Sequence, residues 1–186
     1  MTFRGMVRRP GLAGGKFVRD AKGLSAVEFA LIFPLMALLY LGGCELTQAL
    51  AIKRLVNITS GTVTNLVAQY ATISASQQMP DILYASTQVL TPYPASNATI
   101  VVTCVTIDSN GNATVAWSQA LNGSARVTGS SVTLPPSLDV PNTTVVLGET
   151  TYSYTPLYDF IHMGPVSLYS AVYMLPRVST TIILTS

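Results

Sequence analysis

The chain has 186 residues, of which 49% are hydrophobic and only 10% are charged, whereas charged residues make up about 25% of an ordinary soluble domain. This composition argues against a typical cytosolic enzyme. The length allows one domain of about 100 to 150 residues together with a shorter additional segment.

Charge is distributed unevenly along the chain. Residues 1–23 carry a net charge of +5, residues 24–54 are neutral, and residues 55–186 carry −3. An excess of basic residues on one side of a single apolar segment is typical of a membrane protein with a cytoplasmic N-terminus. A nucleic-acid partner is not supported, because no aromatic platform or binding motif accompanies the basic residues. Residues 1–23 are therefore interpreted as a basic cytoplasmic leader.

An apolar segment follows at residues 24–44. Its 21 residues contain a single charged side chain, Glu28, and as a helix they would extend about 31 Å, enough to span a bilayer. An unpaired carboxylate within a membrane costs about 2 to 3 kcal/mol or more, so Glu28 is expected to have a counter-charge. Pro34 removes a backbone donor that lipid cannot replace, which predicts a kink or packing against a neighbour. Both residues indicate a transmembrane helix that associates with other helices.

The residues around Gly23 carry a specific pattern. Lys22 and Gly23 directly precede Leu24, Glu28 is the fifth residue counted from Leu24, and an apolar stretch follows. This spacing resembles the class III signal of type IV pilin-like proteins. The sequence GLSAVEFALIFPL at residues 23–35 resembles the start of TadE/TadG-like proteins of the tight-adherence (Flp) pilus system. Three later segments are also similar to members of that family: 65–69, 152–157 and 174–177.

The resemblance implies processing and assembly. It implies that a prepilin peptidase cleaves between Gly23 and Leu24, and that Glu28 pairs with the new amine of Leu24 in an adjacent subunit. The protein would be a non-enzymatic minor pilin or pseudopilin in the bacterial inner membrane, with its C-terminus in the periplasm and a place in a surface pilus. Its partners would be the peptidase, other pilins or pseudopilins, and the pilus assembly machinery.

Other signals in the same region leave alternatives open. An uncleaved signal anchor would hold a periplasmic binding domain at the membrane, with Glu28 reaching the interface. Residues 41–44 resemble a lipobox, which would leave an acylated Cys44 as the first residue, although Glu28 and Pro34 interrupt the apolar region that such a signal needs. The pair at residues 8–9 lacks the apolar continuation of a twin-arginine signal.

Beyond residue 44, apolar residues between Ile52 and Ile73 recur at helical spacing, and nothing in the sequence stops a helix before Pro80. Residues 45–79 are therefore predicted to form an extracytoplasmic amphipathic helix that continues the span. Asp81 is the single charge in residues 55–107, and such a low charge content favours burial against a partner.

Residues 80–186 are predicted to form an α+β extracytoplasmic domain. A short helix is expected at residues 81–90, and a break between two strands is expected at Gly148. The predicted strands lie at residues 99–107, 113–120, 143–147, 150–154 and 180–184, the first two forming a hairpin around the turn at 109–112. Because no βαβ alternation occurs, the fold class is α+β, with a long N-terminal helix packed on a small, mostly antiparallel, pilin-like sheet.

Groups suited to catalysis or metal binding are few. His162, the single histidine, follows Asp159 by three residues. Two ligands do not make a zinc site, which needs three or four. A hydrolytic arrangement with Ser167 has no supporting motif. The sequence therefore predicts no enzymatic activity, no metal and no cofactor.

Two further features depend on the compartment. Export would permit a disulfide, but Cys44 ends the apolar segment and Cys104 falls in a predicted strand, so two unpaired thiols are favoured. Five Asn-x-Ser/Thr sequons, taken alone, would favour a eukaryotic type II membrane glycoprotein, whereas the spacing of Gly23 and Glu28 favours a bacterial protein.

A group of tyrosines in the last 35 residues suggests either a contact surface or one face of a strand: Tyr152, Tyr154, Tyr158, Tyr169 and Tyr173.

Overall fold

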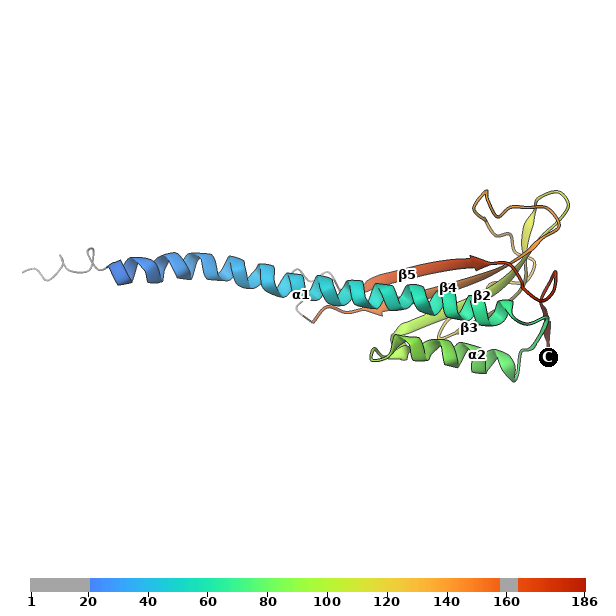
Figure 1. The fold of residues 1–186 in the computed structure, drawn as a ribbon, viewed down its shortest axis with the longest axis horizontal. Helices are drawn as coiled ribbons and strands as arrows, with labels where there is room; N and C mark the ends of the chain where they lie inside the picture. Colours follow the sequence, from blue (N-terminus) through green and yellow to red (C-terminus); the bar gives the residue numbers. More distant parts are fainter. Residues whose placement is uncertain (1–20, 158–163) are drawn as a thin grey trace, which may run out of the picture. The chain divides into compact units, whose positions relative to one another are not determined.

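The structure is a computed structural model that describes residues 21–157 and 164–186. Its contacts divide the chain into two units, Met1–Cys44 and Glu45–Ser186. Helix α1 (Ala21–Ala68) contributes residues to both units (Figure 1). The second unit also contains β1 (Thr72–Ser74), α2 (Gln78–Thr87), η3 (Gln88–Leu90), η4 (Ala95–Asn97), β2 (Ala98–Ile107), β3 (Ala113–Leu121), β4 (Thr144–Tyr154), β5 (Val166–Met174) and β6 (Ile183–Thr185).

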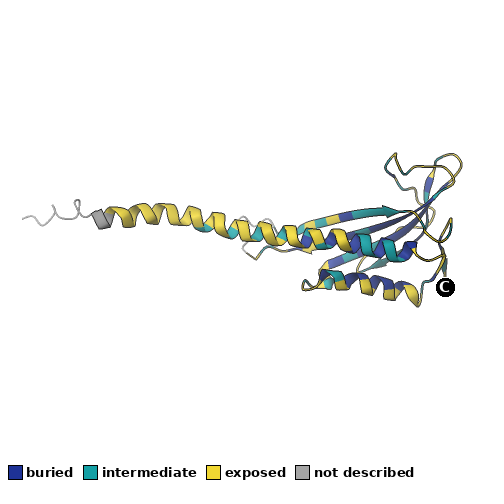
Figure 2. Cartoon of the chain, viewed as in Figure 1, coloured by how far each residue is buried: buried dark blue, intermediate teal, exposed yellow. Residues whose placement is uncertain are grey.

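The described part of the first unit is helical and exposes its apolar side chains at most positions (Figure 2). Leu31 is 75% exposed and Tyr40 is 72% exposed. Among the described residues, α1 is the one helix long and apolar enough to cross a membrane. Leucine and phenylalanine side chains exposed along such a segment are unusual for a soluble unit, and they suit a helical segment that lies in lipid or among other helices.

The second unit contains a four-stranded antiparallel sheet of order β3-β2-β4-β5 and a separate parallel pair, β1 and β6. The α1 residues that follow Cys44 and helix α2 pack on one face of the larger sheet (Figure 1). The α+β class and the mostly antiparallel sheet expected from the sequence are therefore confirmed. The predicted hairpin is confirmed as β2 and β3, joined by a turn in which Gly111 has a φ of +82°.

One buried stripe of α1 builds the core of the second unit. Ile52 and Val56 pack with Tyr152 and Tyr154 of β4, whereas Val63 and Val67 pack with residues of β2 and α2. All four α1 side chains are at most 1% exposed. Full burial of each such aliphatic side chain contributes about 1.5 to 3 kcal/mol, so this stripe fixes α1 on the sheet.

Gly148 lies inside strand β4 and does not separate two strands, so the predicted break is wrong. A Cβ at this position would lie 2.0 Å from Thr64 Oγ1 and 2.9 Å from the carbonyl oxygen of Ser60. The glycine therefore allows the α1 backbone to approach the sheet closely, a common reason for glycine within a strand.

Helix α1 ends at Ala68, eleven residues before the predicted end at residue 79, so the predicted helix is wrong beyond Ala68. Tertiary pairing overrides helix propensity here, because the Ala68 carbonyl accepts the Arg177 N–H at 2.9 Å and Thr72–Ser74 pairs with β6. Pro80 does not stop a helix either. It lies in the first turn of α2, where its missing N–H has no helical acceptor to lose.

Candidate functional site

The residues singled out by the N-terminal motif lie at the start of α1. Gly23 and Leu24 fall within its first turn, and Glu28 follows one turn later. Leu24 is 64% exposed, and the Glu28 side chain is exposed as well. Glu28 takes part in no ion pair among the residues that the structure describes. A counter-charge for this carboxylate is therefore not supplied by the described part of a single chain.

Pro34 lies inside α1, which continues on both sides of it. Its missing N–H leaves the carbonyl of Ala30 without the usual i+4 donor. The neighbouring Phe29 and Phe33 rings, one helical turn apart, lie 5.4 Å apart between centroids. Pro34 and this pair of aromatic rings thus lie in the part of α1 that is predicted to cross the membrane.

The two cysteines differ in environment and are not bonded to each other. Cys44 is exposed on α1, whereas Cys104 is buried in β2. Burial raises the pKa of the Cys104 thiol to about 11, so this thiol stays protonated and is a weak nucleophile at neutral pH. Cys44 therefore carries the one exposed thiol of the chain.

Charged residues of α1 bind the backbone and side chains of the neighbouring strands in the second unit. The hydroxyl of Tyr154 donates a hydrogen bond to Glu45 Oε2, and Lys53 Nζ donates to the carbonyl oxygen of Tyr169. Both bonds join α1 to strands more than 100 residues later in the chain. They fix the rotation of α1 about its axis, because each residue reaches its partner from one helix face only.

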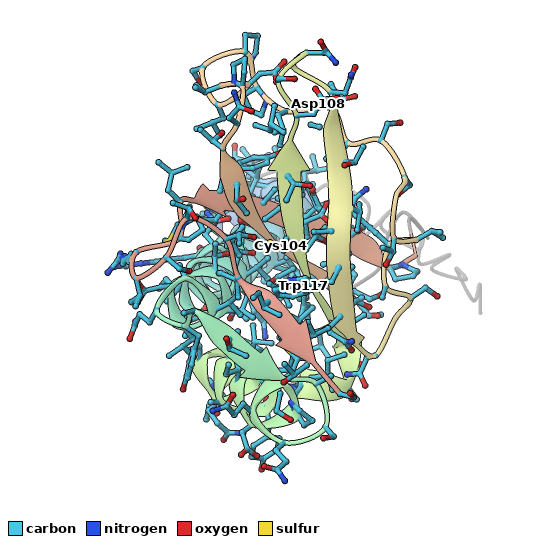
Figure 3. The ribbon with its side chains drawn as sticks, turned by 90° about the vertical axis from the view of Figure 1, so that its right-hand side faces the viewer. Cys104, Asp108 and Trp117 are labelled. Carbon is cyan, nitrogen blue, oxygen red and sulfur yellow. The ribbon has the colours of Figure 1, made fainter. Side chains whose placement is uncertain are left out.

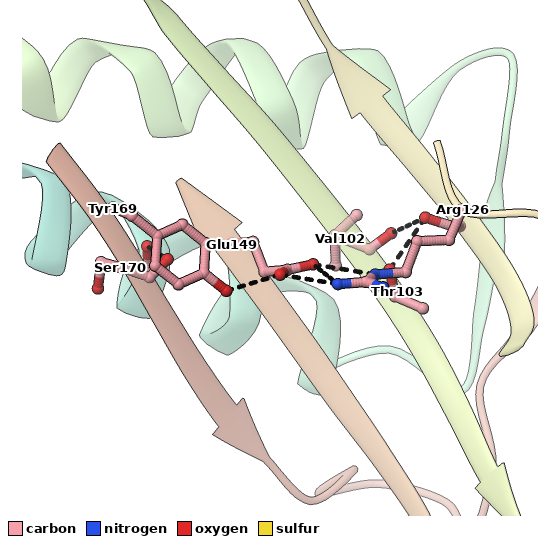
Figure 4. Close-up of polar contacts among 8 residues, drawn as sticks. Val102, Thr103, Arg126, Glu149, Tyr169 and Ser170 are labelled. Atoms are coloured by element: carbon pink, nitrogen blue, oxygen red, sulfur yellow. Dashed lines mark hydrogen bonds and ion pairs between the residues drawn. The ribbon is translucent and has the colours of Figure 1, made fainter. Parts of the chain in front are cut away.

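An ion pair joins the loop after β3 to the sheet (Figure 4). Arg126 donates from Nε and Nη2 to the two oxygens of Glu149, at 2.8 to 3.1 Å. The hydroxyl of Tyr169 donates to Glu149 Oε1 at 2.7 Å. The Glu149 side chain is 13% exposed and the Arg126 side chain 40% exposed. A bidentate arginine–carboxylate pair of this kind is stronger and more directional than an ordinary surface pair.

Two tyrosine hydroxyls have pKa values that burial and these contacts raise. Burial, followed by the hydrogen bond to Glu45, raises the pKa of Tyr154 to about 12. Burial and the hydrogen bond to Glu149 raise the pKa of Tyr169 to about 12. Both phenols are therefore protonated donors throughout the physiological pH range. Tyr152 and Tyr154 are buried, so these two members of the tyrosine group do not form an exposed contact surface.

Strand β3 helps to hold the C-terminal segment in place (Figure 3). Trp117 Nε1 donates to the carbonyl oxygen of Ile182 at 2.8 Å, and Cys104 Sγ lies 4.0 Å from the same oxygen. Ile182 is 2% exposed and directly precedes β6. Cys104 and Trp117 thus act as packing residues beneath the C-terminus, which agrees with the high pKa of the thiol.

The residues considered for catalysis are not brought together by the described structure. Asp159 and His162 lie outside the described residues, as do the residues at positions 8–9 and Tyr158. Ser167 is exposed in β5. Within residues 21–157 and 164–186, no group of three or more metal-ligating side chains occurs.

The sequence did not predict the contacts of Arg126, Glu149 and Tyr169. Arg126 and Glu149 are separated by 23 residues, and their contact depends on the sheet register. One signal was present. Arg126 is one of only two Lys or Arg residues among the residues 55–186, against five carboxylates.

These features define a chain with one N-terminal apolar helix, long enough to anchor it in a membrane, joined to an α+β unit. Residues 23–59 match the family model described as TadE-like protein, so the chain carries a TadE-like N-terminal segment and the resemblance expected from its motif is confirmed. The matched region includes every position singled out in that segment: Gly23, Leu24, Glu28, Pro34 and Cys44. No curated protein and no solved structure matched the chain.

Proposed function

We propose that the protein is a non-enzymatic minor pilin or pseudopilin that serves assembly of a tight-adherence (Flp) pilus. Residues 24–44 would anchor it in the bacterial inner membrane, with residues 1–23 cytoplasmic and the second unit periplasmic. The observation that carries the proposal is the coincidence of the TadE-like match with an exposed apolar segment, residues 24–44 of α1, that contains one carboxylate.

Glu28 supplies the mechanism of assembly in this proposal. A carboxylate in lipid is unfavourable unless a counter-charge lies beside it. Cleavage between Gly23 and Leu24 would create an amine four residues before Glu28. Four residues of helix rise about 6 Å along the axis, so this amine and Glu28 of the same chain lie at different depths. The counter-charge that we propose for Glu28 is the Leu24 amine of an adjacent subunit. Pairing between subunits would make insertion of the next helix favourable and fix its depth.

Processing by a prepilin peptidase is the step to test first. Mass spectrometry of the protein purified from membranes of its native cell measures the mature N-terminus. A start at Leu24 is the expected result. An intact leader would contradict the cleavage and favour an uncleaved anchor with a periplasmic binding domain, whereas an acylated Cys44 as first residue would identify a lipoprotein.

A matched pair of variants separates cleavage from expression. Gly23→Val places a branched side chain at the proposed cleavage position and is expected to leave the full-length chain in the membrane. Gly42→Val makes the same change at a glycine whose added Cβ meets nothing within 4 Å, and it should be processed normally. Equal processing of both variants would show that Gly23 is not recognised.

A further inference from the structure

A pocket lined mainly by residues with polar side chains lies on the sheet face opposite the two helices. Successive residues of a strand point to opposite faces, and Ile100 and Gly148 face the helices. Their neighbours Thr99 and Glu149 therefore face the other way. They line a pocket of about 220 Å³ together with side chains from β5 and from the loop after β3.

The two charged side chains that line this pocket, Arg126 and Glu149, neutralise each other. Both oxygens of Glu149 accept bonds from Arg126, and one also accepts the Tyr169 hydroxyl. The guanidinium and the carboxylate together carry no net charge, and the raised pKa keeps the Tyr169 phenol neutral. An anionic ligand at the guanidinium would also lie beside the Glu149 carboxylate, so the pair offers it no net attraction. The pocket therefore suits a neutral ligand.

Several hydrogen-bonding groups of the pocket remain available. The bonds to Glu149 use Nε and Nη2 of Arg126, and Nη1 donates to no acceptor among the described residues. The side chains of Ser124 and Thr151 also line the pocket, and each hydroxyl can donate and accept. The Tyr169 residue is 49% exposed, which leaves ring surface for an apolar contact.

We propose that this pocket binds one neutral sugar residue. Nη1 of Arg126 and the hydroxyls of Ser124 and Thr151 supply donors and acceptors for adjacent sugar hydroxyls. The exposed Tyr169 ring offers a flat surface to the C–H face of a pyranose. The volume is below the roughly 300 Å³ at which pockets for drug-sized ligands begin, so it accommodates one ring and not an oligosaccharide. The pocket lies wholly in the second unit, and its use does not depend on cleavage at Gly23.

Saturation-transfer NMR on the full chain tests the proposal. The protein is held in a zwitterionic amine-oxide detergent, because sugar-headed detergents would compete. The probes are the methyl α-glycosides of glucose, galactose and mannose, with glucuronate, inorganic phosphate and tetraalanine as alternative ligand classes. We expect transfer to at least one glycoside, with a Kd in the millimolar range.

Variants assign any binding to the pocket. The double variant Arg126→Gln with Glu149→Gln removes both charges without leaving either unpaired, and it should weaken glycoside binding by about tenfold or more. Tyr169→Phe tests the hydroxyl with the ring retained. The control is Tyr84→Phe on α2, which changes a tyrosine that is 67% exposed on the helical side, and it should bind like the parent chain.

The proposal fails under three outcomes. Absence of transfer to all three glycosides would overturn it, as would equal binding by the double variant and the parent chain. Stronger binding of glucuronate, phosphate or tetraalanine would assign the pocket to an anion or a peptide instead. Circular dichroism of each variant confirms that a loss of binding does not reflect unfolding.

Discussion

At the scale of single residues, Glu28 is the side chain whose position is hardest to explain without a partner. It lies on an exposed apolar helix, where an unpaired carboxylate is unfavourable. Its role in assembly predicts a specific phenotype. Glu28→Gln removes the charge and keeps the shape, so the chain should reach the membrane at normal levels while the amount of sheared surface pilus falls by about tenfold or more.

Asp81→Asn is the matched control for that variant, because Asp81 is an exposed carboxylate on α2 in the second unit. It should leave pilus output unchanged. If Glu28→Gln assembles as many pili as the parent chain, the proposed charge pair between subunits is excluded, whatever the state of the leader.

Tyr154 provides a residue-scale prediction of pH dependence. Its pKa is about 12 in the folded chain and about 10 in an unfolded one. Burial and the hydrogen bond to Glu45 both favour the neutral phenol, so their stabilisation of the fold is complete below about pH 10 and is lost as the pH rises through about 12. Tyr154→Phe should therefore lower the free energy of unfolding by about 1 to 2 kcal/mol at neutral pH.

The measurement is denaturant unfolding of the full chain in detergent, from neutral pH to about pH 12. The difference between Tyr154→Phe and the parent chain should shrink at the alkaline end, because the parent loses the bond there. Tyr84→Phe is the control, since Tyr84 is mostly exposed. A difference that stays constant across the range would show that the hydroxyl does not bond to Glu45 in solution.

At the scale of elements, the contact of α1 with β4 depends on the absence of a side chain at Gly148. Gly148→Ala would place a Cβ within 2.0 Å of Thr64 Oγ1 and 2.9 Å of a helix carbonyl. The helix backbone would have to move, so we expect a loss of about 2 to 3 kcal/mol in the free energy of unfolding.

Gly61→Ala is the opposing control. Gly61 lies inside α1, and a Cβ there meets nothing within 4 Å. The change should stabilise the chain by about 0.5 to 1 kcal/mol, because alanine favours a helix over glycine. Chemical unfolding of both variants in the same detergent gives the comparison. Equal effects on stability would contradict the close helix–sheet approach.

Elements with local signals could be predicted from the sequence, and those held by distant partners could not. The β2–β3 hairpin was predicted because its turn, in which Asp108 accepts the Asn110 and Asn112 N–H groups at 2.8 Å, is encoded within five residues. Strand β1 was missed because its three residues are held by β6, about 110 positions later. The end of α1 was misplaced for the same reason.

Candidate sites follow the same rule. The Glu28 motif is contiguous, so spacing alone identified it and the TadE-like match confirmed the resemblance. The Arg126–Glu149–Tyr169 contacts require three elements in register, and no spacing in the sequence encodes that. Strand β5 was missed because both of its faces carry apolar or aromatic side chains. The sequence therefore lacks the alternation of polar and apolar residues that identifies a half-buried strand.

At the scale of the whole molecule, the two cysteines provide a test of topology in the unmodified chain. Cys44 is exposed at the end of the apolar segment, whereas Cys104 is buried in the second unit with a pKa of about 11. A thiol reacts with maleimide as the thiolate. A membrane-impermeant maleimide should therefore add one label to the native chain and two after denaturation.

The side of the membrane from which that single label enters decides the orientation. The basic leader predicts that Cys44 is reached from outside intact spheroplasts, and Cys44→Ser should then remain unlabelled until the chain is denatured. Labelling that requires permeabilised membranes would place Cys44 on the cytoplasmic side. In that case the second unit would not be exported, and neither the proposed pilus role nor a periplasmic binding domain could hold. A native chain that resists labelling from both sides, and gains one label on denaturation, would instead carry a blocked Cys44, as acylation of the lipobox requires.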